Sequence, residues 1–313
     1  MTDLELEIAD SFERIFPPPT VIADWGNVLD RADARRPDPP SRFMGIALGR
    51  SNAVKVLGRA LREASKTVPF RLVSFAGGKS RNAIPRDAVA VCSVAAGDED
   101  AFGGAVAAAA ETIRDAFSKT DPGVSVATDA GDAAADPWSA EATARVLDAV
   151  ALVPTGPLAL SPDFDDLVET STSLGEALTE GDRLTLHSLS RSSNDAALPE
   201  VIAALDAVAR LAGGELEIKV NYGGWRPNLD SPALAAAKTV YERLFGEPPI
   251  VTAVHAGLET AVIGSKVHGL DMLSFGPQIE FPHSPDERVS VPTVERFWRL
   301  LVAFLDESSA KRT

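Results

Sequence analysis

The sequence predicts an α+β region made of two similar helix–strand–strand–helix–strand units, followed by a section of α/β character. Two observations predict this architecture. Apolar residues switch between helical spacing and strand-like runs in the same order twice, on either side of a polar linker at 129–137. A hinge rich in glycine and proline at 222–232 then separates these units from a section in which helices alternate with short strands.

The first unit is expected to begin just after Gly49, where Val54, Leu57 and Leu61 recur at helical spacing. Two apolar runs predict strands at 70–75 and 88–94, with a turn at Gly77-Gly78 between them. A closing strand is expected at 124–128. Before it, a helix should present one apolar face made of Phe102, Val106, Ile113 and Phe117.

The second unit repeats this order of elements. Helices are expected at 139–151 and 197–212, extended segments at 166–178 and 183–190, and an alternating strand at 216–220. The last section should contain a helix at 232–245, strands near 250–254 and 272–275, and a final helix from Val294 with a broad apolar face.

Composition narrows the class of protein. The 313 residues carry a net charge of −15, so the surface repels phosphate backbones and anionic membranes, and neither is an expected partner. The single cysteine, Cys92, excludes a disulfide framework within the chain and suits a small buried side chain better than a catalytic thiol. The acidic start resembles no signal peptide, so a cytoplasmic location is expected.

One polar loop carries an imidazole beside two carboxylates. A strand is expected to end at Gly276, and His283, Asp286 and Glu287 follow. A neutral imidazole is a good zinc ligand, and a carboxylate can orient its second nitrogen. His283 is therefore a candidate metal ligand, with a solvated surface histidine as the alternative.

A second candidate lies where a strand is expected to run into His255 and a helix to start near Leu258. Gly257 and Glu259 flank this helix start. A glycine there exposes backbone N–H groups that can hold a carboxylate. Gly257 and Glu259 are thus candidate substrate-binding residues, and a plain tight turn between strand and helix is the alternative.

The connection between the first two strands offers a fork of donors. Residues 77–87 include Arg81, Asn82 and Arg86. Guanidinium and amide groups in such a fork can grip an anionic group. Arg81 and Asn82 are therefore candidate substrate-binding residues, with a solvated hairpin as the alternative.

Six short segments, taken in order, resemble the bacterial aminoacylhistidine (Xaa-His) dipeptidases, also called the peptidase D family. The resemblance covers roughly residues 45–310 and is densest after 222. The segments are Gly-Gly-…-Arg-Asn-Ala-Ile-Pro-Arg at 77–86, Asp-Leu-Val-Glu-Thr-Ser at 166–171, Ser-Arg-Ser-Ser at 190–193, Gly-Trp-…-Pro-Asn at 224–228, His-Ala-Gly-Leu-Glu at 255–259 and His-Ser-Pro-Asp-Glu-Arg-Val at 283–289.

The resemblance implies a catalytic α/β domain with an inserted lid. Two zinc ions bridged by a carboxylate and a water would form the metal centre, and a glutamate would act as general base on that water. On this mapping residues 1–40 match poorly, 41–221 correspond to the lid, and 222–313 correspond to the second half of the catalytic domain. The expected fold is therefore an α+β lid followed by an incomplete α/β zinc-peptidase half-domain.

The resemblance also implies roles for single residues. His283 corresponds to the family's last zinc ligand, and Asn82 to a lid residue that contacts substrate. Gly257 and Glu259 correspond to a loop that borders the substrate pocket. The family's remaining ligands and its base precede the lid, but no histidine precedes His187 and no Glu-Glu pair occurs anywhere in the sequence. No catalytic residue is therefore assigned, and zinc is expected only from the family.

Three interpretations follow. The first is a truncated or split dipeptidase, inactive alone, whose substrate would be a dipeptide and whose partner would be a missing N-terminal half. The second is a non-enzymatic binding or dimerisation module derived from the lid, for which a homodimer is expected. The third is an enzyme that receives metal ligands from a partner chain. In the first two, residues 232–313 are expected to expose more apolar surface than the lid, or to bury it in a dimer.

Overall fold

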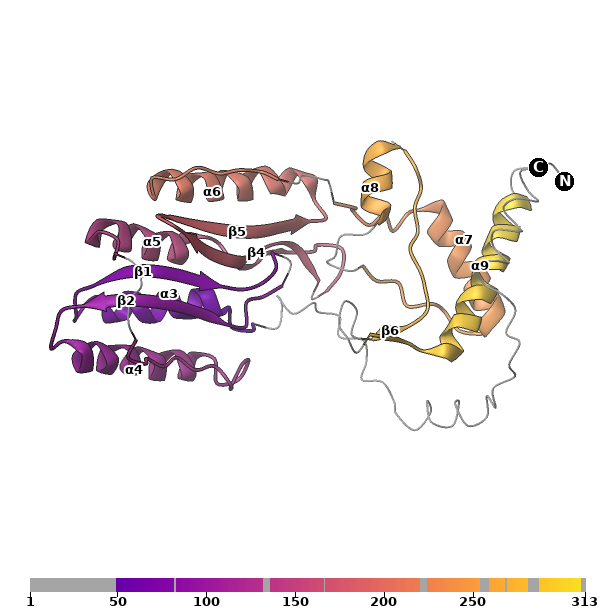
Figure 1. Cartoon of the computed structure of the whole chain (residues 1–313). Helices are drawn as coiled ribbons and strands as arrows, with labels where there is room; N and C mark the ends of the chain where they lie inside the picture. The colour runs from indigo at the N-terminus through magenta and orange to yellow at the C-terminus, as the bar shows by residue number, and fades with distance from the viewer. Residues whose placement is uncertain are drawn as a thin grey trace. The chain divides into compact units, whose positions relative to one another are not determined.

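The computed structural model describes residues 49–81, 83–131, 136–165, 167–219, 224–253, 259–267, 269–280 and 287–310 (Figure 1). The chain divides into two compact units. The larger comprises Ser41–Ala235 and Pro248–Leu273, and the smaller comprises Met1–Pro40, Ala236–Glu247 and Ser274–Thr313. Within the described parts, no helix combines the length and apolar character needed to cross a bilayer.

A five-stranded antiparallel sheet forms the centre of the larger unit. Its order is β2-β1-β4-β3, and β5 pairs with β4. The β1–β4 contact is a single residue pair, Gly77↔Ala177, whereas β4 and β5 form a long hairpin. The strands are β1 (Phe70–Gly77), β2 (Ala88–Val94), β3 (Gly156–Leu160), β4 (Val168–Glu180) and β5 (Arg183–Ser192).

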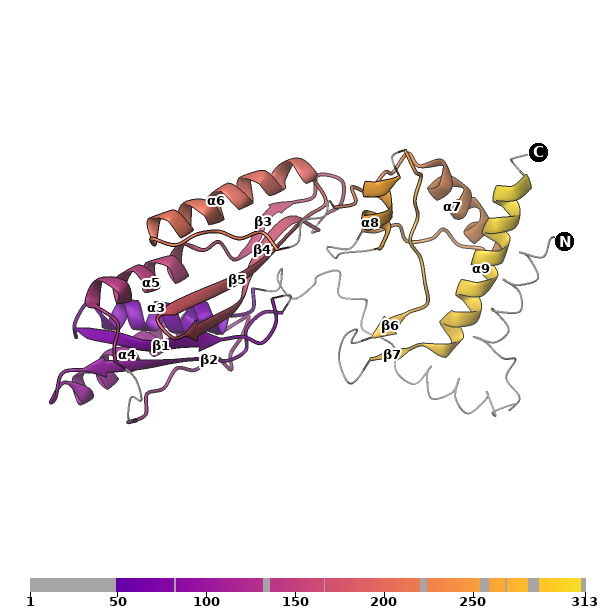
Figure 2. The same ribbon diagram turned by 45° about the horizontal axis from the view of Figure 1, so that its top comes forward.

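Helices cover this sheet and supply most of its core. Contacts join α3 to β1, β2 and α4, α5 to α3 and β1, and α6 to β5 (Figures 1 and 2). Leu72, Phe75 and Leu174 of the sheet are fully buried against Val54 of α3 and Val150 of α5. The helices are α3 (Ala53–Ala64), α4 (Glu99–Ala116), α5 (Ala140–Leu152) and α6 (Leu198–Leu211).

Polar side chains fix the ends of two of these helices. Asn52 caps α3 by accepting from the backbone N–H of Lys55, and its amide donates to the carbonyl of Leu174 at 2.7 Å. Lys55 Nζ in turn donates to the carbonyls of Val150, Ala151 and Val153 at 2.6–2.8 Å. One lysine thus satisfies carbonyls that the C-terminal end of α5 leaves without helical donors.

The main helices and the paired strands agree with the sequence, but four expected strands are not formed. Within the described residues, 124–128, 216–219, 250–253 and 272–275 have no ladder partner. Strand β3, which the sequence analysis did not predict, is half-exposed and contains Pro157, so it lacks the apolar alternation of a typical strand. The twofold order of helix–strand–strand–helix–strand is therefore incomplete, although the mixed architecture with an antiparallel sheet is confirmed.

In the smaller unit, α9 (Val291–Ala310) packs against the part of α7 (Pro232–Phe245) that belongs to this unit. Arg296 of α9 donates to Tyr241 Oη at 2.8 Å and lies 4.0 Å from the ring centroid of Phe245. The opposite side of α9 is exposed. It carries an apolar stripe made of Val291, Val294, Trp298, Val302 and Leu305.

Candidate functional site

The connection between β1 and β2 is held against β4 by backbone contacts. Gly78 has a φ of +75°, and its N–H donates to the carbonyl of Asp87 at 3.1 Å. A Cβ on Gly175 of β4 would lie 2.6 Å from the carbonyl oxygen of Arg81. Only a glycine fits there, so the strand fixes the backbone position of Arg81.

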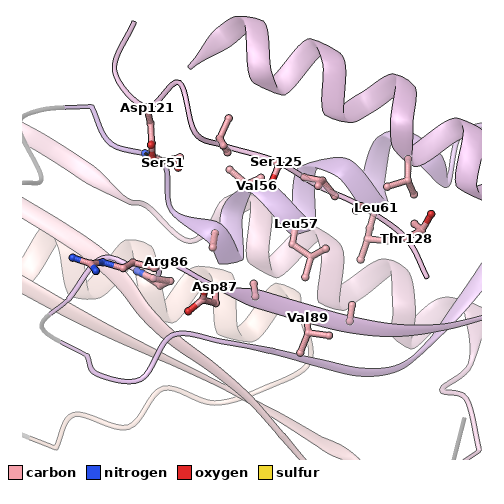
Figure 3. A pocket seen from close by; sticks show the side chains of 18 of the residues that line it. Ser51, Val56, Leu57, Leu61, Arg86, Asp87, Val89, Asp121, Ser125 and Thr128 are labelled. Atoms are coloured by element: carbon pink, nitrogen blue, oxygen red, sulfur yellow. Dashed lines mark hydrogen bonds between the residues drawn. The ribbon is translucent and has the colours of Figure 1, made fainter. Parts of the chain in front are cut away.

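Arg81 itself is exposed and lines a large cavity together with three other arginines. Arg50 precedes α3, Arg86 precedes β2, and Arg191 lies on β5. Figure 3 labels Arg86, Asp87, Ser51 and Asp121 among the residues that line this cavity. We call the region lined by Arg50, Arg81, Arg86 and Arg191 the basic end of the cavity.

Arg191 contributes the most unusual group at the basic end. Among the described residues, its buried Nε has no hydrogen-bond partner, and neither has the buried Oγ of Ser173 on β4. Both residues line the cavity. A buried donor without a partner costs about 1–3 kcal/mol, so this end of the cavity favours a ligand that accepts hydrogen bonds.

Five carboxylates line the cavity with the four guanidinium groups, namely Asp87, Glu99, Asp100, Asp121 and Asp129. Asp121 accepts hydrogen bonds from the backbone N–H and the hydroxyl of Ser51. Glu99 and Asp100 lie in the first turn of α4, which follows the far end of β2. Guanidinium groups bind small anions such as a carboxylate, so the basic end is the candidate anion site of the cavity.

The other candidate residues fall in different places. Glu259 is the first residue of α8 (Glu259–Lys266), exposed, and does not line the cavity that Arg81 lines. Asn82, Gly257 and His283 lie outside the described residues. Of the candidate residues that the structure describes, only Arg81 lines this cavity.

The segment around His283 is flanked by a short two-stranded ladder. Strands β6 (Ile279–Glu280) and β7 (Arg288–Val289) pair in antiparallel register, and Arg288 Nε donates to Glu280 at 2.6 Å. Among the described residues, no group of three or more histidine, cysteine, aspartate or glutamate side chains is arranged to hold a metal ion. His187 faces a single carboxylate, with Nε2 3.8 Å from Glu176 Oε2.

Sequence reasoning did not select Arg191 as a candidate residue. The run Ser-Arg-Ser-Ser at 190–193 contains it, and that run is part of the family resemblance. Its position on a strand gave no sign that Nε would be buried. The burial of Nε arises only when β4 and β5 pair, which places Ser171 opposite Arg191.

No protein-family model matches the chain. A comparison with curated proteins finds the cytosol non-specific dipeptidase of Escherichia coli K12, 35% identical over 269 residues, which are 85% of this chain and 55% of the relative. Among solved structures, the aminoacylhistidine dipeptidase of Vibrio alginolyticus matches with a TM-score of 0.73 at 35% identity, over 82% of this chain and 53% of that one. The chain spans about half the length of these relatives, and it belongs to the peptidase D family of dipeptidases.

Proposed function

We propose that this chain is the substrate-binding part of a peptidase-like protein and that it holds the carboxylate of a dipeptide at the basic end of the cavity. Residues 41–221 would be the lid and 222–313 the second half of a catalytic domain. The names of both relatives support a dipeptide as the ligand. The observation that carries the proposal is the buried Nε of Arg191, for which the described part of the chain supplies no hydrogen-bond partner.

Arg191 and Arg81 have complementary roles in this proposal. Arg191 supplies a buried Nε donor, and a donor shielded from water binds a carboxylate more strongly than an exposed one does. Arg81, held by its backbone contact with Gly175, supplies a second donor from the edge of the same cavity. We propose that Asn82 completes this fork, and that Gly257 and Glu259 border the other end of the dipeptide.

A carboxylate-dependent binding assay tests the proposal. Titration calorimetry with an Xaa-His dipeptide should detect binding that falls at least 10-fold for Arg191→Met, because the neutral side chain cannot pair with the carboxylate. The same dipeptide with an amidated C-terminus should bind the wild-type chain as weakly as the free dipeptide binds Arg191→Met. Arg114→Met on the exposed face of α4 is the matched control, since Arg114 pairs only with Glu111. Equal affinity for the free and the amidated dipeptide would contradict the proposal.

Zinc is the metal that the family resemblance implies, with His283 as its ligand. One zinc ion takes about three protein ligands and a pair takes more, and the described residues hold no such group of side chains. The sequence has four histidines, and the one among the described residues, His187, lies near the carboxylate of Glu176. We therefore propose that the described residues alone do not complete a two-metal centre or hydrolyse dipeptides.

The alternative is a non-enzymatic binding or dimerisation module. The exposed apolar stripe on α9 favours it, because a stripe with side chains 40–56% exposed is typical of a surface that another helix covers. Sedimentation of the wild-type chain and of Trp298→Lys tests this reading. A dimer that dissociates only in the variant would support the module. In either case we infer a cytoplasmic location, the compartment for which the E. coli relative is named.

A further inference from the structure

Two pairs of hydroxyl groups flank Arg191 on the face of the β4–β5 hairpin opposite to its own side chain. Side chains alternate along a strand, so Ser190 and Ser192 of β5 lie on the face away from Arg191. The hydroxyl oxygen of Ser192 lies 2.8 Å from that of Thr170. Ser190 forms the same kind of pair with Thr172 at 2.9 Å, and both threonines are almost fully buried. Cross-strand hydrogen bonds therefore join β5 to β4 on both sides of Arg191.

The pair of Thr170 and Ser192 belongs to a longer chain of hydrogen bonds. The backbone N–H of Asn194 donates to Ser192 Oγ at 2.9 Å, so the hydroxyl hydrogen of Ser192 is available to Thr170. Thr170 Oγ1 in turn donates to Glu169 Oε1 at 3.4 Å, and the side-chain amide of Asn194 donates to the same oxygen at 3.5 Å. Each hydroxyl in this circuit thus has one donor and one acceptor as neighbours. We call Glu169, Thr170, Ser192 and Asn194 the polar ring.

Backbone contacts hold the same end of β5. The N–H of Ser193 donates to the carbonyl of Glu169 at 3.1 Å. A Cβ on Gly224 would overlap the carbonyl oxygen of Ser192, and the N–H of Gly224 donates to Asp195 Oδ1 at 2.7 Å. The polar ring therefore lies in a closely packed strand end, where the loss of one hydroxyl leaves buried groups without a partner.

We propose that Thr170, Ser192 and Asn194 are positioning residues, which fix the direction of the Arg191 side chain toward the carboxylate of the dipeptide. The inference rests on the proposed function, in which Arg191 binds that carboxylate. None of the three residues lines the cavity, so each acts through the backbone of β5. A change in the twist of β5 beside Arg191 moves the whole guanidinium group, and a displacement of about 1 Å can weaken a precisely oriented contact by about 100-fold.

Variants of Thr170 in the full chain separate the hydroxyl from the shape of the side chain. Thr170→Val keeps the shape and removes the hydroxyl, whereas Thr170→Ser keeps the hydroxyl. Titration calorimetry gives the ratio of the affinities for an Xaa-His dipeptide and for its C-terminally amidated form. Thr170→Val should lower this ratio by about fivefold or more, because the guanidinium group is misplaced. Thr170→Ser should stay within about twofold of the wild type, because its hydroxyl keeps both neighbours.

Thr179→Val is the matched control for a role in stability alone. Thr179 lies on the same strand, and its hydroxyl accepts from the N–H of Phe75 at 2.9 Å and donates to the carbonyl of Phe75 at 2.8 Å. Its loss should lower the free energy of unfolding and leave the ratio of affinities unchanged. An equal fall of the ratio in Thr179→Val and Thr170→Val, or no fall in Thr170→Val, would overturn the proposal.

Exchange of the Arg191 Nε–H with water, measured by NMR, tests the positioning without a dipeptide. The Nε is buried, so its proton should exchange slowly in the wild-type chain. Thr170→Val and the smaller change Ser192→Ala should each speed this exchange by about 10-fold or more, and Thr179→Val should not. If the wild-type chain bound the free and the amidated dipeptide alike, the proposed function would fail, but this pattern of exchange would still support the polar ring as what positions Arg191. Equal exchange in the wild type and both ring variants would overturn the inference.

Discussion

Replacing Gly175 by alanine should disturb the backbone at Arg81 more than the size of one methyl group suggests. The added Cβ would lie 2.6 Å from the carbonyl oxygen of Arg81 and 2.7 Å from both its carbonyl carbon and its Cα. Carbon atoms in contact prefer about 3.5–4.0 Å, so a shift of roughly 1 Å is required. All three atoms belong to the backbone and cannot move aside by changing a rotamer.

The cost follows from this geometry. Overpacking a well-packed site costs about 1–3 kcal/mol, and Gly175 is buried at a bulge where the β4–β5 register shifts. Gly104 of α4 is the matched control, because a Cβ there meets nothing within 4 Å. Gly104→Ala should raise the free energy of unfolding by about 0.5–1 kcal/mol, since alanine favours a helix interior over glycine.

Urea unfolding of both variants measures the two effects, and NMR shifts report the displacement around Arg81. We expect Gly175→Ala to lower the unfolding free energy, to move resonances at 78–83, and to weaken dipeptide binding at least 10-fold. If Gly175→Ala is as stable as the wild type while Gly104→Ala gains stability, the connection is not held by β4 and the reasoning fails.

Two further residues give predictions with simple assays. Lys55→Met removes the donor to three carbonyls at the end of α5 and should lower the free energy of unfolding, measured with urea, by about 1–3 kcal/mol. An unchanged free energy of unfolding would mean that water satisfies these carbonyls in place of the ammonium group. Burial lowers the pKa of Lys55 from 10.5 to about 8, so between these pH values the unfolded chain binds more protons than the folded chain. The free energy of unfolding should therefore rise with pH from about 8 to 10.5, and it should rise less in Lys55→Met. Burial raises the pKa of the Cys92 thiol to about 12, whereas free cysteine has a pKa near 8.5. Because only the thiolate reacts, Cys92 should react with a disulfide reagent at pH 8 at least about 100-fold more slowly than free cysteine. Rapid labelling of Cys92 without urea would contradict its burial.

Local patterns predicted the helices and the central strands well, because their signals are local. The spacing of Val54, Leu57 and Leu61 and the cap at Asn52 both lie within α3 itself. The expected strand at 124–128 depends on a partner that is distant in sequence, and no local pattern reports whether that partner pairs with it. Strand β3 is the converse case, since pairing with β4 makes a strand from residues with weak propensity of their own.

The candidate site was predictable only where the residue type alone carries the chemistry. Arg81 was selected because guanidinium groups bind anions; it lines the cavity, and its role in binding stays a prediction. Arg191 required knowledge of burial, which arises from the pairing of two long strands. The roles of Asn82, Gly257, Glu259 and His283 remain predictions.

We propose that this chain holds the carboxylate of a dipeptide and does not complete a two-metal centre on its own. The most direct test is metal analysis of the purified 313-residue chain, loaded with excess zinc and desalted, alongside hydrolysis of an Xaa-His dipeptide. We predict fewer than two bound zinc ions per chain and no turnover, with dipeptide binding that Arg191→Met abolishes. Two zinc ions per chain with hydrolysis of the dipeptide would contradict it.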